Sequence, residues 1–278
     1  RDYAVTGVQT CALPICGDVF ASPSTIQVYK AIQQTASTKG TLLIVKNYSG
    51  DCMNFDAAAE MSEEDDDYNV ERVYVNDDIA VKDSLYTVGR RGVAGTIFVQ
   101  KLAGAAAEQG MSLQEVKAIA LKAIANVRSI GFAFTSCTVP AKGSPTFQLG
   151  EGEMEYGVGI HGEPGIAREA IVSADELASR MVAQILEDLS ANQSDFGAAK
   201  EVAVMINGLG ATPLQELYVL SRGVQLALEG KGVAVYKTLV GNYMTAIDMA
   251  GASVTLLRLD DELKALLDAP VHTLALNW

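Results

Sequence analysis

The sequence contains few histidines and few basic residues, and both scarcities exclude classes of function. Only two of the 278 residues are histidine, and 21 Lys and Arg stand against 34 Asp and Glu, which gives a formal net charge of −13. Such an acidic surface repels the phosphates of nucleic acids and of anionic membranes. We therefore expect no nucleic-acid partner and no membrane partner.

Cysteine is also scarce, and long apolar runs are absent. The four cysteines show neither CxxC spacing nor the density of a disulfide scaffold, which suits a reducing compartment, so we expect a cytoplasmic protein. No apolar run is long enough to cross a bilayer, and no cluster of His, Cys and Asp has metal-ligand spacing. The sequence therefore predicts no metal site.

Residues 1–16 show neither a signal-peptide pattern nor a regular helical or strand period. The first methionine is Met53, so we expect a chain that is not a natural full-length product. The segment VTGVQTCALPI resembles a translated sequencing adapter. We expect residues 1–16 to be an artefact without native structure and exclude them from fold reasoning.

From residue 17 onward, strand patterns alternate with helical ones. The apolar run Leu42–Val45 predicts a buried strand that runs into a polar loop, and residues 70–78 repeat this form with an Asn-Asp-Asp turn. Residues 95–129 predict two helices, the second begun by a capping box at Ser112. Strands followed by helices indicate an α/β fold.

The second half of the sequence continues this alternation. Residues 173–189 predict an amphipathic helix, and Thr212 is predicted to be the N-cap of a further helix over residues 214–228. We therefore predict two α/β domains, each with a largely buried sheet flanked by helices. The first spans residues 17–129 and the second residues 130–278.

The segment EYGVGIHGEPG places His161 among four glycines. The alternation of Tyr156, Val158 and Ile160 predicts a strand that carries His161 to the carboxyl edge of a sheet, where open α/β sheets bind ligands. An ordinary imidazole is largely neutral near pH 7 and can act as a base or a nucleophile. A structural histidine bonded into a turn is the alternative, but the glycines favour an approachable ring.

A second candidate site follows the predicted strand. Lys46, Asn47, Gly50 and Asp51 lie directly after Val45. A carboxylate there could accept the hydrogen of a substrate hydroxyl, and a lysine could orient a polar ligand. The same pattern fits an Asx-type turn with an exposed lysine equally well, so both interpretations stay open.

Two further features favour structural roles. Arg90 and Arg91 lie between glycines and could clamp an anion, but in an acidic protein such arginines more often pair with carboxylates. His272 lies near the end of the sequence, where we expect it to pack the C-terminal tail.

Seven segments of the chain resemble one known family. They are similar to the dihydroxyacetone-binding subunit of dihydroxyacetone kinase, and the resemblance runs from Gly17 to Trp278. GVGIHGEPG and the GRRGVAGT motif are its most specific parts. The segments are GDVFASPS (17–24), IVKNYSGDCMNF (44–55), DDIAVKDSLYTVGRRGVAGT (77–96), SCTVPAKG (136–143), MEYGVGIHGEPGI (154–166), NGLGATPLQELY (207–218) and DAPVHTLALNW (268–278).

The resemblance implies a role for each candidate residue. His161 would attack the ketone carbon of dihydroxyacetone and hold the substrate as a covalent hemiaminal, which glycerol cannot form because it has no carbonyl. Asp51 would bind a terminal hydroxyl and assist its deprotonation. Lys46, Ser22 and Gly50 would bind the substrate.

The resemblance also implies partners. The chain itself would hold no cofactor, and ADP or ATP with Mg would be bound by a nucleotide-binding kinase subunit. The chain ends where the family's substrate-binding domain ends, which favours the type whose ADP is rephosphorylated by a phosphoenolpyruvate-dependent phosphotransferase-system donor protein. We expect a homodimer. The alternative is a non-catalytic paralogue that senses dihydroxyacetone as a coregulator of a transcription factor.

One motif of the family has no counterpart here. Family members carry an upstream GGGSGHEP motif whose histidine serves as acid/base, and nothing before Gly17 matches it. Because the chain has only two histidines, we expect a protein truncated at its N-terminus and impaired in activity.

Overall fold

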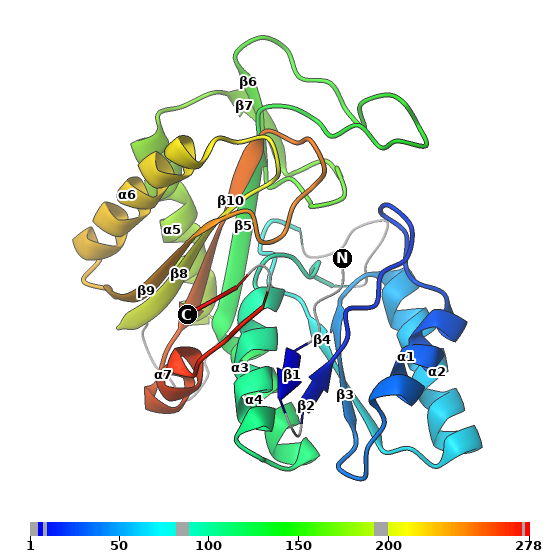
Figure 1. Ribbon diagram of the computed structural model, residues 1–278. Coiled ribbons are helices and arrows are strands. Elements are labelled where there is room, and N and C mark those ends of the chain that lie inside the picture. The colour runs from blue at the N-terminus through cyan, green and yellow to red at the C-terminus, as the bar shows by residue number, and fades with distance from the viewer. Residues whose placement is uncertain (1–4, 8–9, 82–88, 192–199, 274–275) are drawn as a thin grey trace.

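The computed structural model describes residues 5–7, 10–81, 89–191, 200–273 and 276–278. Part of the motif at 77–96 and part of residues 1–16 therefore lie outside the described residues. The described chain stacks in alternating layers of helices and strands (Figure 1). This arrangement confirms the predicted α/β fold.

The first sheet is a parallel pair of strands. The strands confirm both predictions for this region, and two helices cover their outer face. Ser24 caps the first helix with a complete capping box, and Val28, Leu43 and Phe55 lie in the core between helices and strands. These elements are α1 (Thr25–Thr35), β3 (Thr41–Lys46), α2 (Ser49–Asp66) and β4 (Val70–Val75).

The second sheet is mixed and has six strands in the order β7-β6-β5-β10-β8-β9. Two helices cover one face of this sheet, and the predicted apolar stripe of the first, from Leu177 to Leu189, is buried. The strands are β5 (Val127–Ala133), β6 (Glu153–Tyr156), β7 (Ala167–Ala170), β8 (Glu201–Gly208), β9 (Ala234–Gly241) and β10 (Gly251–Arg258), and the helices are α5 (Ala174–Ala191) and α6 (Leu214–Gly230).

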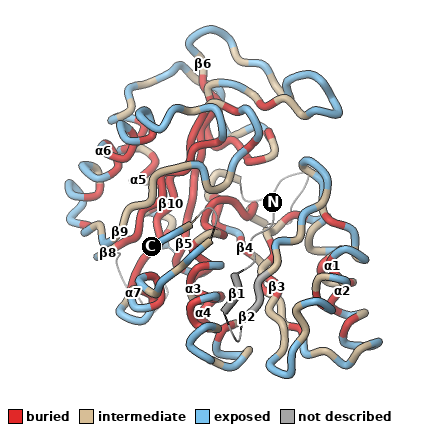
Figure 2. Tube along the Cα trace, viewed as in Figure 1, coloured by how far each residue is buried: buried red, intermediate tan, exposed pale blue. Residues whose placement is uncertain are grey.

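A helical layer lies between the two sheets and packs on both. It contains α3 (Thr96–Glu108) and α4 (Leu113–Asn126), with α7 (Asp261–Asp268) beside them, and α4 begins at the predicted capping box of Ser112. Their core includes Val75 of β4 and Met205 of β8, so both sheets share these helices (Figure 2). The domain boundary between 129 and 130 stays a prediction.

A short hairpin precedes α1 in the chain. Its strands, β1 (Val5–Gly7) and β2 (Thr10–Ala12), pair antiparallel in a segment for which the sequence predicted no element. The origin of residues 1–16 stays a prediction.

The predicted cap of α6 is wrong. The N-cap residue is Pro213, and no side chain caps the helix. The Thr212 hydroxyl instead donates to the carbonyl of Gly251 at 2.6 Å and accepts from its N–H at 2.8 Å. These bonds satisfy both backbone groups of the first residue of β10, and they use the hydroxyl that would have capped the helix.

The predicted strand up to Ile160 is also wrong, because β6 ends at Tyr156. Tyr156 pairs with Ala167 of β7, and the N–H of Ile166 donates to the Tyr156 carbonyl at 2.8 Å. Residues 157–166 therefore form the loop of a hairpin. The side chains of Val158 and Ile160, which belong to this loop, are buried, and this explains why their spacing resembles that of a strand.

Candidate functional site

His161 lies in the β6–β7 loop with its ring held between two aromatic side chains. The ring contacts Phe20 and Tyr48 edge-on, with centroids 5.0 and 4.6 Å away. Phe20 has φ of 57°, a conformation uncommon for an aromatic residue. The His161 side chain is 26% exposed, so two aromatic rings fix it while one part stays open to solvent.

Glu163 determines which nitrogen of His161 carries the proton. One oxygen of its carboxylate accepts a hydrogen bond from the backbone N–H of His161 at 2.9 Å, and the other oxygen lies 3.2 Å from the ring nitrogen Nδ1. Burial raises the pKa of Glu163. The hydrogen bond and charge of His161 and the charge of Arg91 lower it by more, so the pKa lies below its ordinary value. An ionised carboxylate only accepts hydrogen bonds, so Nδ1 is the protonated nitrogen of the neutral ring. The lone pair is then on Nε2.

The glycines around His161 make room for neighbouring side chains. A Cβ at Gly159 would lie 2.1 Å from Glu163 Oε2 and 2.6 Å from Arg91 Nη1. Gly162 has φ of 73°, and a Cβ there would lie 2.4 Å from Thr146 Oγ1. Tight packing of the loop is therefore a sufficient reason for these glycines.

Asp51 lies beside the other predicted site residues. Lys46 ends β3, and Asp51 follows in the first turn of α2, where the helix dipole favours a carboxylate. Burial raises the pKa of Asp51, while the Lys46 charge, a hydrogen bond from Ser22 and the charge of His161 oppose this rise. The four side chains therefore lie near enough for their charges and hydrogen bonds to act on Asp51.

Gly50 separates Lys46 from Asp51 and lies against the Ser22 segment. A Cβ at Gly50 would lie 3.3 Å from Ser22 Cβ, so even alanine would require a small shift of Ser22. Asn54 of α2 donates to the Ser22 hydroxyl at 3.1 Å and fixes Ser22 beside the start of this helix. The carboxylate, lysine and hydroxyl therefore lie near one another, and their role as a site stays a prediction.

The ionisation of Asp51 provides a direct check of this cluster. Replacing Lys46 with methionine removes a positive charge that favours the carboxylate, so the Asp51 pKa should move to higher pH. Carboxyl ¹³C NMR of labelled aspartate measures this titration. The exposed Lys142→Met is the control and should leave it in place. An Asp51 pKa that does not change in Lys46→Met would show that the Lys46 charge does not act on Asp51.

Several residues that contact the site had no role in the sequence analysis. Phe20, Tyr48 and Glu163 all contact His161. Each lies inside a segment that carried the resemblance, which is the one signal that could have found them. The Tyr48 hydroxyl is buried and has no hydrogen bond to the described residues.

The arginine pair forms ion pairs, as the carboxylate interpretation predicted. Arg90 binds Asp188 of α5 through two nitrogens, and Arg91 lies 2.6 Å from Asp78. His272 is exposed, and its Nδ1 lies 2.7 Å from Asn277 Oδ1 in the C-terminal tail. The second histidine of the chain is therefore engaged within this tail.

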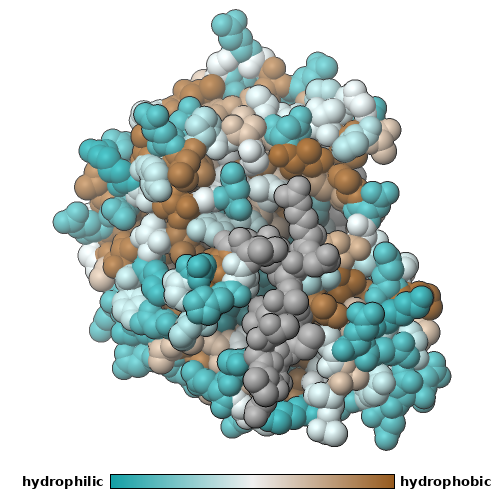
Figure 3. Space-filling model, in the orientation of Figure 1, coloured by the Kyte–Doolittle hydropathy of each residue, from teal (hydrophilic) through white to brown (hydrophobic). Residues whose placement is uncertain are grey.

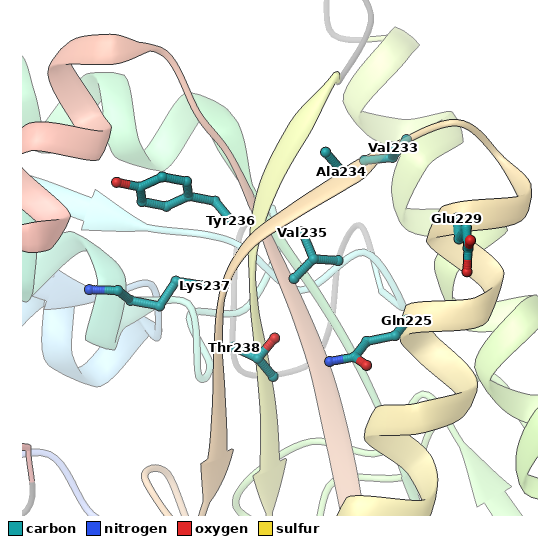
Figure 4. A pocket seen from close by; sticks show the side chains of 8 residues that line it. All are labelled: Gln225, Glu229, Val233, Ala234, Val235, Tyr236, Lys237 and Thr238. Atoms are coloured by element: carbon teal, nitrogen blue, oxygen red, sulfur yellow. The ribbon is translucent and has the colours of Figure 1, made fainter.

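A separate groove of about 450 Å³ lies between α6 and the edge strand β9 (Figure 4). Its lining includes Gln225, Tyr236 and Lys237 but none of the predicted site residues.

Hydrophilic residues cover much of the face over α1 and α2 (Figure 3). Among the described residues, no three His, Cys, Asp or Glu are placed to hold a metal, and no helix is long and apolar enough to cross a membrane.

Comparison with known proteins identifies the family. The Dak1 domain matches residues 3–275. The dihydroxyacetone-binding subunit DhaK of the PTS-dependent dihydroxyacetone kinase 1 of Listeria innocua serovar 6a is 50% identical over 274 residues, which are 98% of this chain and 81% of that protein. The chain belongs to the Dak1 domain family, as its motifs predicted.

Two solved structures share this fold. The dihydroxyacetone kinase of C. freundii has a TM-score of 0.85 and 35% identity over 97% of this chain and 48% of its own. The dihydroxyacetone kinase operon co-activator Dha-DhaQ has a TM-score of 0.87 and 32% identity over 96% of this chain and 81% of its own. Since the fold serves both a kinase and a co-activator, function has to be argued from the site.

Proposed function

We propose that this chain is the substrate-binding subunit of a dihydroxyacetone kinase and holds dihydroxyacetone covalently on His161. The observation that carries this proposal is the Glu163 carboxylate facing Nδ1, because it leaves a lone pair on Nε2 of a half-buried ring. The identity to a dihydroxyacetone-binding subunit supports the choice of ligand.

Capture proceeds by addition to the ketone. Nε2 forms a bond to C2, the carbonyl π electrons move to oxygen, and that oxygen gains a proton. The ring gives up its Nδ1 proton to Glu163, which releases it to solvent, and the new oxygen takes its proton from solvent, so the adduct forms without a net change in protons. Glycerol has hydroxyls but no carbonyl and cannot react in this way, so covalent chemistry provides the selectivity.

Phosphoryl transfer is assigned to Asp51 and a partner. Asp51 takes the proton of a terminal hydroxyl whose oxygen attacks the γ-phosphoryl group of a nucleotide on the partner subunit, and ADP leaves. Ser22, Lys46 and Gly50 bind the substrate.

The surrounding system follows from the relatives' names. A PTS-dependent relative and a PEP-dependent relative from Escherichia coli support phosphoenolpyruvate as ultimate donor, through a phosphotransferase-system protein that rephosphorylates the nucleotide. The nucleotide and its Mg²⁺ belong to the partner subunit. We propose a cytoplasmic homodimer for the chain itself.

A second candidate function is a dihydroxyacetone sensor that acts as coregulator of a transcription factor. The similarity to the co-activator Dha-DhaQ favours it. Such a protein needs His161 for capture but has no use for Asp51 as a base. A protein that captures dihydroxyacetone but transfers no phosphoryl group would therefore be a sensor, whereas a kinase subunit would do both.

Labelled substrate tests the capture step. With [2-¹³C]dihydroxyacetone, the C2 signal should move from the ketone region to that of a tetrahedral carbon when the protein is added. Excess glycerol should not displace this signal, because glycerol forms no adduct. A C2 resonance that stays ketonic at saturation would exclude the hemiaminal.

A further inference from the structure

A buried arginine lies near Glu163, behind His161. Glu163, which faces Nδ1, lies beside Arg91: the space that a Cβ at Gly159 would need is bordered by Glu163 Oε2 at 2.1 Å and Arg91 Nη1 at 2.6 Å. Arg91 is 1% exposed, so its charge acts on Glu163 with little screening by water. The two charges face each other across a glycine.

The other donors of Arg91 fix the position of its guanidinium. Nε and Nη2 both contact Asp78 Oδ2, at 2.8 and 2.6 Å, and Nη2 also donates to the Gly157 carbonyl at 2.9 Å. Asp78 follows β4, whereas Gly157 begins the loop that carries His161. Arg91 therefore connects the two halves of the fold at the base of this loop.

We propose that Arg91 is a positioning residue for His161, which keeps Glu163 charged and facing Nδ1 so that Nε2 retains its lone pair. A buried carboxylate without a cation takes up a proton or turns towards water. Either change would remove the acceptor that holds the proton on Nδ1. Only the consequence for capture rests on the proposed function, because the site of the ring proton is a property of the protein without substrate.

The test is ¹⁵N NMR of the imidazole nitrogens in histidine-labelled protein, at a pH where the rings are neutral. The chain has two histidines, and His272→Asn identifies the signals of His161. The parent protein should show a majority of Nδ1–H at His161. Arg91→Met should lose this majority to Nε2–H. The matched control Arg90→Met should keep it, because Arg90 pairs with Asp188 of α5.

Two further variants cover a failure of Arg91→Met to fold. Asp78→Leu/Arg91→Met removes the buried pair together, so neither of its charges is left alone, and it should show the same shift to Nε2–H. Arg91→Lys retains a cation and should restore Nδ1–H. A folded Arg91→Met or double variant that keeps the Nδ1–H majority would overturn the proposal, since a merely structural role changes thermal stability but leaves the ring proton in place.

The proposed function can fail separately from this inference. If the parent protein shows Nδ1–H but no adduct with [2-¹³C]dihydroxyacetone, capture is wrong and the positioning role stands. If the adduct forms equally well in Arg91→Met with an unchanged ring proton, the positioning role is wrong and capture stands.

Discussion

Replacing His161 with glutamine is expected to abolish covalent capture of dihydroxyacetone. Glutamine keeps a polar side chain but has no nitrogen lone pair that adds to a ketone. The tetrahedral C2 signal should disappear, and apparent affinity should fall by at least about 100-fold, which corresponds to ~2.7 kcal/mol. Isothermal titration with dihydroxyacetone measures the second quantity.

The other histidine supplies the matched control. His272 is exposed and bonded to Asn277, so His272→Gln should leave both the adduct and the affinity unchanged. Retention of the tetrahedral signal in His161→Gln would show that another group holds the substrate. Loss of the signal in both variants would point to an effect on folding rather than on a nucleophile.

Replacing Asp51 with asparagine is expected to lower phosphoryl transfer by about 10²- to 10⁴-fold, the usual contribution of a general base. The amide keeps the size of the carboxylate but cannot take the proton of the substrate hydroxyl. Capture on His161 should survive, because the adduct does not need Asp51. Product formation is measured over long incubations with a nucleotide-bearing partner subunit.

The comparison of parent and Asp51→Asn also separates the two candidate functions. Equal, measurable transfer by both proteins would remove Asp51 from the mechanism. Capture without transfer by either protein would favour the coregulator. Asp56→Asn is a suitable control, because Asp56 lies further along α2 and contacts Tyr74 and Arg72 of β4.

The fold followed from the sequence where the apolar period was regular. Leu42–Val45 lies within β3, and the stripe from Leu177 to Leu189 is buried on α5. The segment that carries His161 was harder to predict, because the loop residues Val158 and Ile160 are buried and repeat the alternation of a strand. The spacing of apolar residues indicates which side chains are buried, and it identifies a strand only where the backbone also pairs with a neighbouring strand.

The candidate site was predictable where one motif carried neighbouring residues. Lys46 and Asp51 are close in the chain, and the turn between β3 and α2 keeps them close in space. The placement of Arg91 near Glu163 was not predictable, because it brings a loop near the first sheet beside a loop of the second. Only tertiary packing brings those two charges together.

The most direct test of the central claim is a crystal structure of the protein soaked with dihydroxyacetone. We predict continuous electron density at bonding distance from His161 Nε2 to C2 of the substrate, with a terminal hydroxyl beside Asp51. Separate density for an intact ketone next to the ring, or substrate bound elsewhere with His161 unmodified, would contradict the account.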